Sequence, residues 1–426
     1  MPATLDSLDG CCCLCPKAAG KESAAVRKPP NFPTWTIPAV LMLATTVSIL
    51  ATDLYTPSLP TLARTFGVPA ETVQLTMTLN LAGFAFGQLL YGPLSDRFGR
   101  RPVMLAGVAL FMLSSAACAL AWSIESLIVF RVFQGLTAAC EAVICWAVIK
   151  ELYGEKDGVR VVAIFSMVIA VAPAVGPVIG SQMLIRFGWE SNFWLLTGLA
   201  LTAIVALFAF LRETATPDRR ALQPGCLIAE ARRTVRVPAF WLYSIGPAAA
   251  LGGLFAFVTE GPFVLIDQMG LTPDVFGYHY AAVVAAFIAT NLTVNRIAAK
   301  VEGALLLRIG SVLALTGGAL AVLLAATGWI APWSLCVAAA LFVSSMALVY
   351  AVAPLKALAS TDASTGMASS IRGCMEMLGA MLGSAGVSAL HDGTHWPLVI
   401  VMAVAAVCMA LGNWGARRVE RGGSPS

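Results

Sequence analysis

The chain has 426 residues, of which 58% are hydrophobic and only 12% are charged, against roughly 25% charged residues in a typical soluble domain. This composition excludes an ordinary soluble enzyme and predicts an all-α polytopic membrane protein. The net charge of +4 requires no nucleic-acid partner, because the placement of the basic residues described below accounts for it.

Residues 1–35 are predicted to be a disordered tail. The tail lacks the apolar segment of a cleavable signal peptide, so the first membrane helix should anchor the chain. It contains a cysteine cluster, Cys11, Cys12, Cys13 and Cys15, without a second ligand pair at zinc-finger spacing. A disordered tail is therefore favoured over metal binding or lipidation, and we expect no metal site and no cofactor.

Twelve apolar segments long enough to cross a bilayer follow the tail. They fall near 36–58, 72–94, 103–122, 124–149, 161–185, 190–211, 239–263, 274–297, 303–326, 331–355, 363–388 and 395–416. A polar loop, 212–238, separates the first six from the last six. We therefore predict two six-helix halves, 36–211 and 239–416, and a short C-terminal tail, 417–426.

Six charged side chains fall inside the predicted spans, where each should face a cavity or a partner because charge is costly in hydrocarbon. They are Asp53, Arg131, Glu141, Glu260, Arg372 and Glu376. Asp53, near the end of the first span, either exchanges a proton as its access to water changes or caps the following turn. Arg131 and Glu141 point in nearly the same direction on the fourth span. Each either supports proton exchange or forms a structural hydrogen bond.

Arg372 and Glu376 are four residues apart in the eleventh span, so they can pair on one helical face. The pair either recognises a charged or zwitterionic group of a substrate or is structural. Glu260 precedes Gly261 and Pro262, where a broken helix would expose carbonyl groups; the alternative is the water-exposed outer end of the seventh span. Four aromatic side chains could line an apolar substrate cavity: Tyr55, Phe84, Trp146 and Phe257.

A polar loop joins the second and third spans with the sequence "GPLSDRFGRRP". Its candidate functional residues are Gly92, Asp96, Arg97, Gly99, Arg100 and Arg101. Asp96 can cap a helix or pair with one of the arginines, and Gly99 permits a tight turn of the backbone. The G-x-L-x-D-R-x-G-R-R pattern resembles the loop signature of the major facilitator superfamily. In that family the loop latches the two halves in the outward-facing state.

The fifth span contains "AVAPAVGPVIGS", in which small residues and proline permit close packing and a bend. Gly176, Pro177 and Gly180 resemble the fifth-helix antiporter motif of the same family, although Ala172 and Ser181 stand where glycine is usual. The alternative interpretation of this segment is an ordinary packing helix that is rich in glycine and proline.

Two further stretches resemble the family. "RVFQGLTAA" is similar to its fourth-helix motif, whose arginine, here Arg131, serves proton coupling. "TDLYTPSLP", around Asp53, resembles the first helix of the twelve-span drug:proton antiporters of the Bcr/CflA group, which includes chloramphenicol and florfenicol exporters. Relatives usually have uncharged residues at positions 372 and 376, so Arg372 and Glu376 depart from the pattern.

The resemblance implies the major facilitator fold and a proton-coupled exporter of small amphiphilic drugs, such as chloramphenicol-type antibiotics, that works by alternating access. It implies proton coupling through Asp53 and Arg131, and Glu141, as a further acid inside a span, is the third candidate for this role. One alternative is an exporter of a metabolite made by the cell, such as a nucleoside, an amino-acid derivative or a siderophore. Another is a sensor or assembly protein that kept the fold and lost transport. We expect no enzymatic activity and a monomer whose partners are its substrate, protons and the lipid bilayer.

The basic residues predict the orientation in the membrane. Of the 27 Lys and Arg residues, 23 fall on the side that carries both termini, which is therefore predicted to be cytoplasmic in a plasma (inner) membrane. Three histidines, His279, His391 and His395, fall at or near outer loops without forming a metal cluster, so we expect surface roles for them.

Overall fold

The computed structural model describes residues 35–153, 156–215, 223–298, 300–361, 363 and 365–422. These described residues form helices and their connections, and twelve helical segments are long and apolar enough to cross a membrane. The prediction of an all-α protein with twelve membrane-spanning helices is therefore confirmed. The cysteine cluster of the N-terminal tail lies outside the described residues.

The first six spans are built from α1 to α7. Their bounds are α1 (Thr36–Asp53), η2 (Thr56–Ser58), α2 (Leu59–Phe66), α3 (Ala70–Phe98), α4 (Arg100–Ala119), α5 (Ile124–Tyr153), α6 (Lys156–Phe187) and α7 (Glu190–Phe210). A 3-10 turn, η2, joins α1 to α2, and together they form the first span. Gly67 ends α2 in the left-handed conformation, with φ +63°, which glycine adopts without steric cost.

The last six spans are built from α9 to α15. The bounds are α8 (Pro224–Val235), α9 (Pro238–Pro262), η3 (Phe263–Gln268), α10 (Pro273–Ile297), α11 (Gly303–Thr327), α12 (Pro332–Tyr350), α13 (Ala353–Ala359), α14 (Thr365–Leu390) and α15 (Trp396–Gly422). Proline stands at the start of α8, α9, α10 and α12, where its missing N–H would have had no helical partner. The short helix α8 lies within the predicted polar loop.

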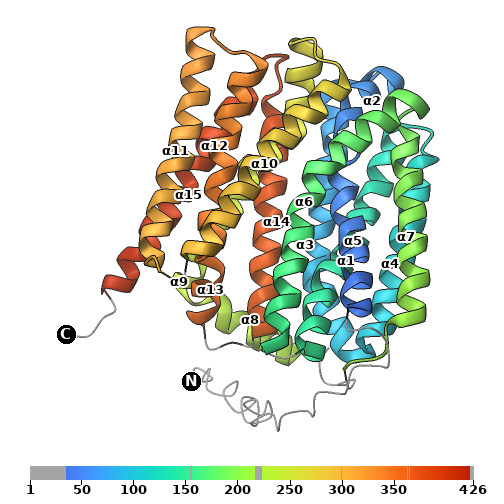
Figure 1. The fold of residues 1–426 in the computed structure, drawn as a ribbon, viewed down its shortest axis with the longest axis vertical. Helices are drawn as coiled ribbons and strands as arrows, with labels where there is room; N and C mark the ends of the chain where they lie inside the picture. The colour runs from blue at the N-terminus through green and yellow to red at the C-terminus, as the bar shows by residue number, and fades with distance from the viewer. Residues whose placement is uncertain are drawn as a thin grey trace, which may run out of the picture.

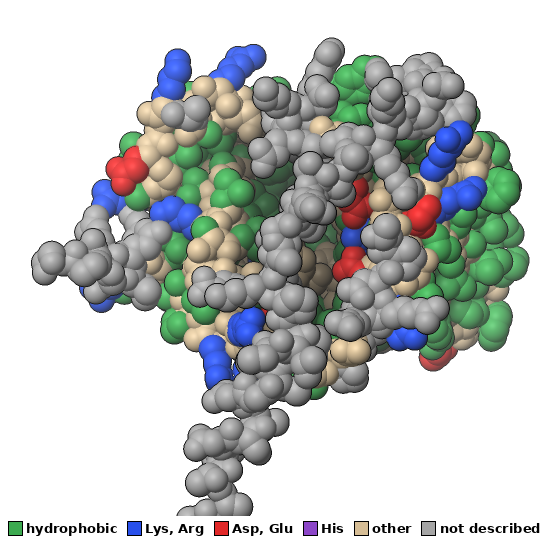
Figure 2. Space-filling model, turned by 90° about the horizontal axis from the view of Figure 1, so that it is seen from below, with side chains coloured by type: hydrophobic (Ala, Val, Ile, Leu, Met, Phe, Trp, Pro, Cys, Tyr) green, Lys and Arg blue, Asp and Glu red, His purple; other side chains and the backbone are tan. Residues whose placement is uncertain are grey.

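Figure 1 shows helices α1–α7, in blue to green, on one side of the bundle and α9–α15, in yellow to red, on the other. The start of α1, the linker helix α8 and the end of α15 all lie at the lower end of the bundle. Helix α3 packs against α14, and α6 packs against α10, so these two helix pairs join the two sides. Viewed from below, Lys and Arg side chains are distributed over both sides of this lower face (Figure 2).

Candidate functional site

Asp53 is the last residue of α1 and only 5% of it is exposed. The Tyr280 hydroxyl of α10 donates a hydrogen bond of 3.0 Å to Asp53 Oδ1. Tyr280 is itself buried, and its ring stacks on Phe257 of α9 with a centroid distance of 6.0 Å. The carboxyl group therefore bridges the two sides of the bundle instead of lying in the outer solvent.

The glycines of the fifth predicted span bring α6 against the end of α1. A Cβ atom placed on Gly176 would lie 2.9 Å from Asp53 Cβ, and one placed on Gly180 would overlap the carbonyl oxygen of Leu54. On its other side α6 approaches α10, where a Cβ on Gly277 would lie 3.0 Å from the carbonyl oxygen of Pro177. These close approaches hold Asp53 at the junction of α1, α6 and α10.

Arg131 of α5 is completely buried and is bound by neutral groups. Its Nη1 donates to the carbonyl oxygen of Ala51 at 2.9 Å and to Gln134 Oε1 at 2.5 Å. The guanidinium carbon lies 4.3 Å from the centre of the Tyr55 ring, whose hydroxyl is 2.5 Å from Thr76 Oγ1 of α3. Because Ala51 is in the last turn of α1, Arg131 places a positive charge at the negative end of that helix.

Glu141 is buried three turns along α5 from Arg131 and also faces α1. The hydroxyl of Ser48 donates a hydrogen bond to Glu141 Oε2. Glu141 Oε1 is buried without a hydrogen-bond partner among the described residues. Arg131 and Glu141 therefore both contact α1, at Ala51 and Ser48, while Asp53 points to Tyr280 on the opposite side of the bundle.

Glu260 of α9 is completely buried between the two sides of the bundle. Gln74 Nε2 of α3 donates to Glu260 Oε2 at 2.5 Å, and His391 Nδ1, just after α14, lies 2.8 Å from Glu260 Oε1. The helix does not break at Gly261 and Pro262, because α9 continues to Pro262 and is followed directly by the wider π-helical turn η3. Neither expected environment of Glu260, a broken helix or a water-exposed end, is present.

Additional hydrogen bonds join α3 to α14 and α9 close to Glu260. Thr78 Oγ1 lies 2.7 Å from Ser384 Oγ, which also accepts a hydrogen bond of 3.0 Å from Thr259 Oγ1. Ser388 Oγ donates to the backbone oxygen of Glu71 at 3.0 Å. Together with the Gln74–Glu260–His391 contacts, these bonds hold the two sides together at the end of the bundle opposite α8.

His391 should make the contact between the two sides at this end of the bundle, called the closed end, depend on pH. The hydrogen bond to the Glu260 carboxylate raises the pKa of His391 above its ordinary value of 6.5, and the nearby charges of Glu71 and Asp392 act in the same direction. His391 also lines a cavity of about 320 Å³ whose other charged side chains are Arg64 and Asp267. Protonated His391 stabilises the contacts that hold the two sides together at this end. This stabilisation should be complete below pH 6.5 and should be lost as the pH rises through the raised pKa of His391.

This pH dependence can be measured with spin labels where α6 and α11 end, on the side of the bundle opposite α8. Labels at Arg186 and Trp329, both exposed, should report a wider distance distribution as the pH rises, in a background without native cysteines. His391→Gln should abolish the dependence. His279→Gln, which removes a histidine whose hydrogen bond among the described residues is to the carbonyl of Val275 in its own helix, should retain it. An unchanged pH profile in His391→Gln would contradict the prediction.

Arg372 and Glu376 form an ion pair on α14, with side-chain exposures of 20% and 10%. Arg372 Nε is buried without a partner among the described residues. Neither residue contacts the Asp53 or Glu260 clusters through a described hydrogen bond. The pair is thus a separate, partly accessible charged position on the helix that packs against α3.

The four candidate aromatic residues divide into two kinds. Tyr55 and Phe257 are buried and support Arg131 and Tyr280, respectively. Phe84 is partly buried, and Trp146 is 43% exposed with its ring edge-on to Phe165 at 5.1 Å. Of the four, only Phe84 and Trp146 present surface that a substrate could contact.

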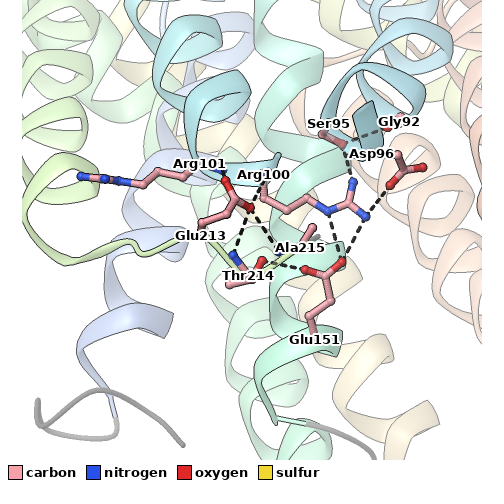
Figure 3. Close-up of polar contacts among 9 residues, drawn as sticks. All are labelled: Gly92, Ser95, Asp96, Arg100, Arg101, Glu151, Glu213, Thr214 and Ala215. Atoms are coloured by element: carbon pink, nitrogen blue, oxygen red, sulfur yellow. Dashed lines mark hydrogen bonds and ion pairs between the residues drawn. The ribbon is translucent and has the colours of Figure 1, made fainter. Parts of the chain in front are cut away.

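The predicted polar loop, Gly92 to Arg101, is helical in the structure except at Gly99, which joins α3 to α4. This segment is the centre of a charged network at the lower end of the bundle (Figure 3). Arg100 Nη2 binds Asp96 Oδ1 at 2.6 Å and Glu151 Oε1 of α5 at 3.1 Å, and Arg100 Nη1 donates to the Ser95 hydroxyl. Gly99, with φ +97°, makes the turn between the helices, and a Cβ there would collide with Glu213. The network therefore depends on glycine at this position.

The remaining residues of this segment contact groups outside the ion pairs of Arg100. Arg101 Nη2 donates to the carbonyl oxygen of Phe208 on α7 at 2.9 Å, whereas Arg97 lies over the neighbouring ring of Phe98. Gly92 accepts a hydrogen bond of 2.9 Å from Ser95 Oγ and faces α14, where a Cβ would lie 3.3 Å from Ser370 Oγ. The loop thus contacts helices on both sides of the bundle.

Sequence reasoning missed two members of this network, Glu151 and Glu213. Glu213 follows α7 and accepts hydrogen bonds from the backbone N–H groups of Arg100, Arg101, Thr214 and Ala215, at 2.8 to 3.1 Å. Two of these donors belong to the first turn of α4, where a carboxylate is favoured by the helix dipole. In the sequence, both residues read as ordinary charges at the ends of apolar segments.

Glu213→Gln should destabilise the fold. An amide keeps only one accepting oxygen and turns its NH₂ group toward a backbone donor, so at least one partly buried N–H loses its partner, at a cost of about 1 kcal/mol. The melting temperature of the purified protein, followed by intrinsic fluorescence, should fall. Glu302→Gln, at an exposed position before α11, is the matched control and should leave it unchanged. Equal melting temperatures for the two variants would contradict this prediction.

Comparisons with known proteins agree with this architecture. The chain is 31% identical over 395 residues to a chloramphenicol resistance protein of Pseudomonas aeruginosa, covering 88% of this chain and 90% of that protein. It is 29% identical to a bicyclomycin resistance protein homolog of Haemophilus influenzae, covering 84% and 90%. It is 31% identical to the multidrug transporter MdfA of Edwardsiella ictaluri, covering 64% and 67%.

Solved structures share the fold at low sequence identity. A D-xylose-proton symporter superposes with a TM-score of 0.69 at 16% identity, covering 88% of this chain and 97% of that one. A bacterial homolog of the human lysosomal transporter Spinster, in an inward-facing and unoccupied conformation, gives 0.71 at 15% identity, covering 92% and 98%. The family model described as Major Facilitator Superfamily matches residues 41–384. The chain therefore belongs to the Major Facilitator Superfamily.

Proposed function

We propose that the protein exports small amphiphilic drugs, such as chloramphenicol-type antibiotics, in exchange for protons. Family membership makes it a transport protein and not an enzyme, as the sequence predicted. The names of the similar proteins, which are associated with chloramphenicol resistance, bicyclomycin resistance and multidrug transport, support this proposal. The observation that carries the coupling is the buried Asp53, bound to Tyr280 across the two sides of the bundle.

The position of Asp53 at the junction of α1, α6 and α10 explains how a drug could be exchanged for a proton. Separation of α1 from α10 would break the bond to Tyr280 and admit water to the carboxyl group, which then exchanges a proton with the medium. Arg131 holds the last turn of α1 to α5 at Ala51, so this part of α1 moves together with its own half. Proton exchange and opening are therefore linked through one helix end, with the proton gradient as the driving force and no cofactor.

We place the lower end of the bundle, with both termini, in the cytoplasm of a cell with a plasma (inner) membrane. The charge bias of the loops supports this orientation. The network of Asp96, Arg100 and Glu151 would then act at the cytoplasmic end as a latch, while Gln74, Glu260 and His391 close the outer end. Two halves, 36–211 and 239–416, would rock around the site in a monomer.

Export of a cell-made metabolite is the second candidate, and the Arg372–Glu376 pair favours it. An ion pair whose arginine is partly accessible suits a charged or zwitterionic substrate better than a neutral antibiotic. The third candidate, a sensor or assembly protein that lost transport, is disfavoured by the intact charged network between α3, α4 and α5.

A susceptibility and efflux panel in a pump-deficient bacterial host tests the function. Expression of the protein should raise the inhibitory concentration of amphenicols relative to an empty vector and lower their accumulation, and a protonophore should reverse this. Unchanged susceptibility to every drug of the panel, with normal amounts of protein in the membrane, would reject drug export and favour the metabolite exporter.

A further inference from the structure

A groove of about 710 Å³ lies between α11 and α15, away from the junction of the two halves. Its lining combines two arginines and a tryptophan with small and branched apolar side chains. The lining residues are Arg308, Ser311, Val312, Leu315, Ala410, Leu411, Trp414 and Arg418. Six of the large side chains are well exposed, so the groove opens at the surface of the bundle: Arg308, Val312, Leu315, Leu411, Trp414 and Arg418.

The alignment of α11 and α15 places the two arginines at one end of the groove, the basic end, and apolar side chains at the other end, the apolar slot. Asn413 Nδ2 donates to Ser311 Oγ at 3.0 Å, which sets α15 beside α11 at this level. Arg308 and Arg418 each lie about one helical turn from that bond, toward the end where α11 begins and α15 ends. Leu315 lies about one turn away in the opposite direction.

The two arginines have the properties of an anion-binding pair. Arg308 forms no ion pair with a described acidic residue, and the same holds for Arg418, whose guanidinium instead lies 3.7 Å from the centre of the Trp414 ring. Stacking on the indole holds the guanidinium plane in place while leaving its N–H groups free to bind an oxyanion. Arg308 lies near the start of one membrane-spanning helix and Trp414 near the end of another, positions where arginine and tryptophan are typical of the boundary between hydrocarbon and lipid headgroups.

We infer that this groove binds an anionic phospholipid of the membrane leaflet on the side of the two termini. The phosphate would lie between Arg308 and Arg418, with the Ser311 hydroxyl at its inner edge, and one acyl chain would follow Val312, Leu315 and Leu411. The apolar slot is the reason to choose a lipid over free phosphate, which would use only the basic end. Basic pockets between membrane helices on the cytoplasmic side are known to hold acidic headgroups.

Lipid retention tests the inference independently of transport. Purified protein, delipidated and then incubated with phosphatidylglycerol, is analysed by native mass spectrometry, with phosphatidylcholine and inorganic phosphate as further probes. Wild type should retain phosphatidylglycerol in preference to phosphatidylcholine, and R308Q/R418Q should reduce this retention about tenfold. The variant should fold normally, because both arginines are exposed.

A matched control carries the same loss of charge at the same end of the bundle. R236Q/R296Q replaces two exposed arginines, at the end of α8 and in the last turn of α10, and should retain phosphatidylglycerol like wild type. Equal retention by wild type and R308Q/R418Q would overturn the inference. Equal thermal stabilisation of wild type by inorganic phosphate and by phosphatidylglycerol would also overturn it, because the apolar slot would then contribute nothing.

Discussion

Asp53→Asn should abolish the accumulation of drug against its concentration gradient while leaving drug binding in place. The amide has nearly the shape of a protonated carboxyl group and its oxygen can still accept the hydrogen bond from Tyr280, but it cannot exchange a proton. Chloramphenicol uptake into proteoliposomes under an imposed pH gradient should therefore fall to the level of protein-free liposomes. Equilibrium binding, followed by tryptophan fluorescence, should stay close to that of wild type.

Asp267→Asn is the control for this experiment, because it removes an exposed acid near the same end of the bundle. It should retain uptake. Uphill uptake at the wild-type rate by Asp53→Asn would move the coupling site to Glu141 or Glu260, the two other acids among the described residues that are completely buried. Drug-induced proton release in detergent should also shrink in Asp53→Asn, which provides a second measurement that needs no membrane gradient.

Gly180→Ala should disrupt the junction of α1 and α6. The added methyl group would overlap the carbonyl oxygen of Leu54, a backbone atom that cannot rotate away, so the two helices must separate. Such overpacking costs about 1–3 kcal/mol, and it displaces the neighbouring Asp53 from Tyr280. We expect a lower melting temperature and a strong loss of export at equal amounts of protein in the membrane.

Gly198→Ala on α7 separates this steric effect from the general effect of replacing glycine in a helix. A Cβ atom at Gly198 meets nothing within 4 Å, so alanine there should be neutral or slightly stabilising through its better helix propensity. Similar behaviour of the two variants would show that the close approach at Gly180 does not matter for function.

The membrane spans could be predicted from the sequence because bilayer thickness fixes the length of an apolar helix. The predicted span 190–211 matches α7 almost residue for residue. Local details could not be predicted in the same way. Helix α8 lies in a stretch that was predicted to be a loop, and the tenth span contains a second helix, α13, after a turn at Ala351 and Val352. Such features depend on tertiary packing, which hydropathy does not encode.

The charged positions were recognised, but their partners were not. The contact between Asp53 and Tyr280 spans 227 residues of sequence, and hydropathy gives no information about pairing over such a distance. His391, for which the sequence suggested only a surface role, instead binds the buried Glu260 because the end of α14 lies against α9. The assignment of these residues to proton coupling or gating stays a prediction that the variants above test.

The bond between Arg131 and Ala51 has a consequence for comparing related sequences. The acceptor is a backbone oxygen, which every amino acid carries, so any small residue at position 51 would preserve the contact. For this contact, unlike those to the side chains of Gln134 and Tyr55, the arginine therefore has no partner position whose identity must change together with its own. A search for pairs of positions that vary together would overlook this contact, although it ties the end of α1 to α5.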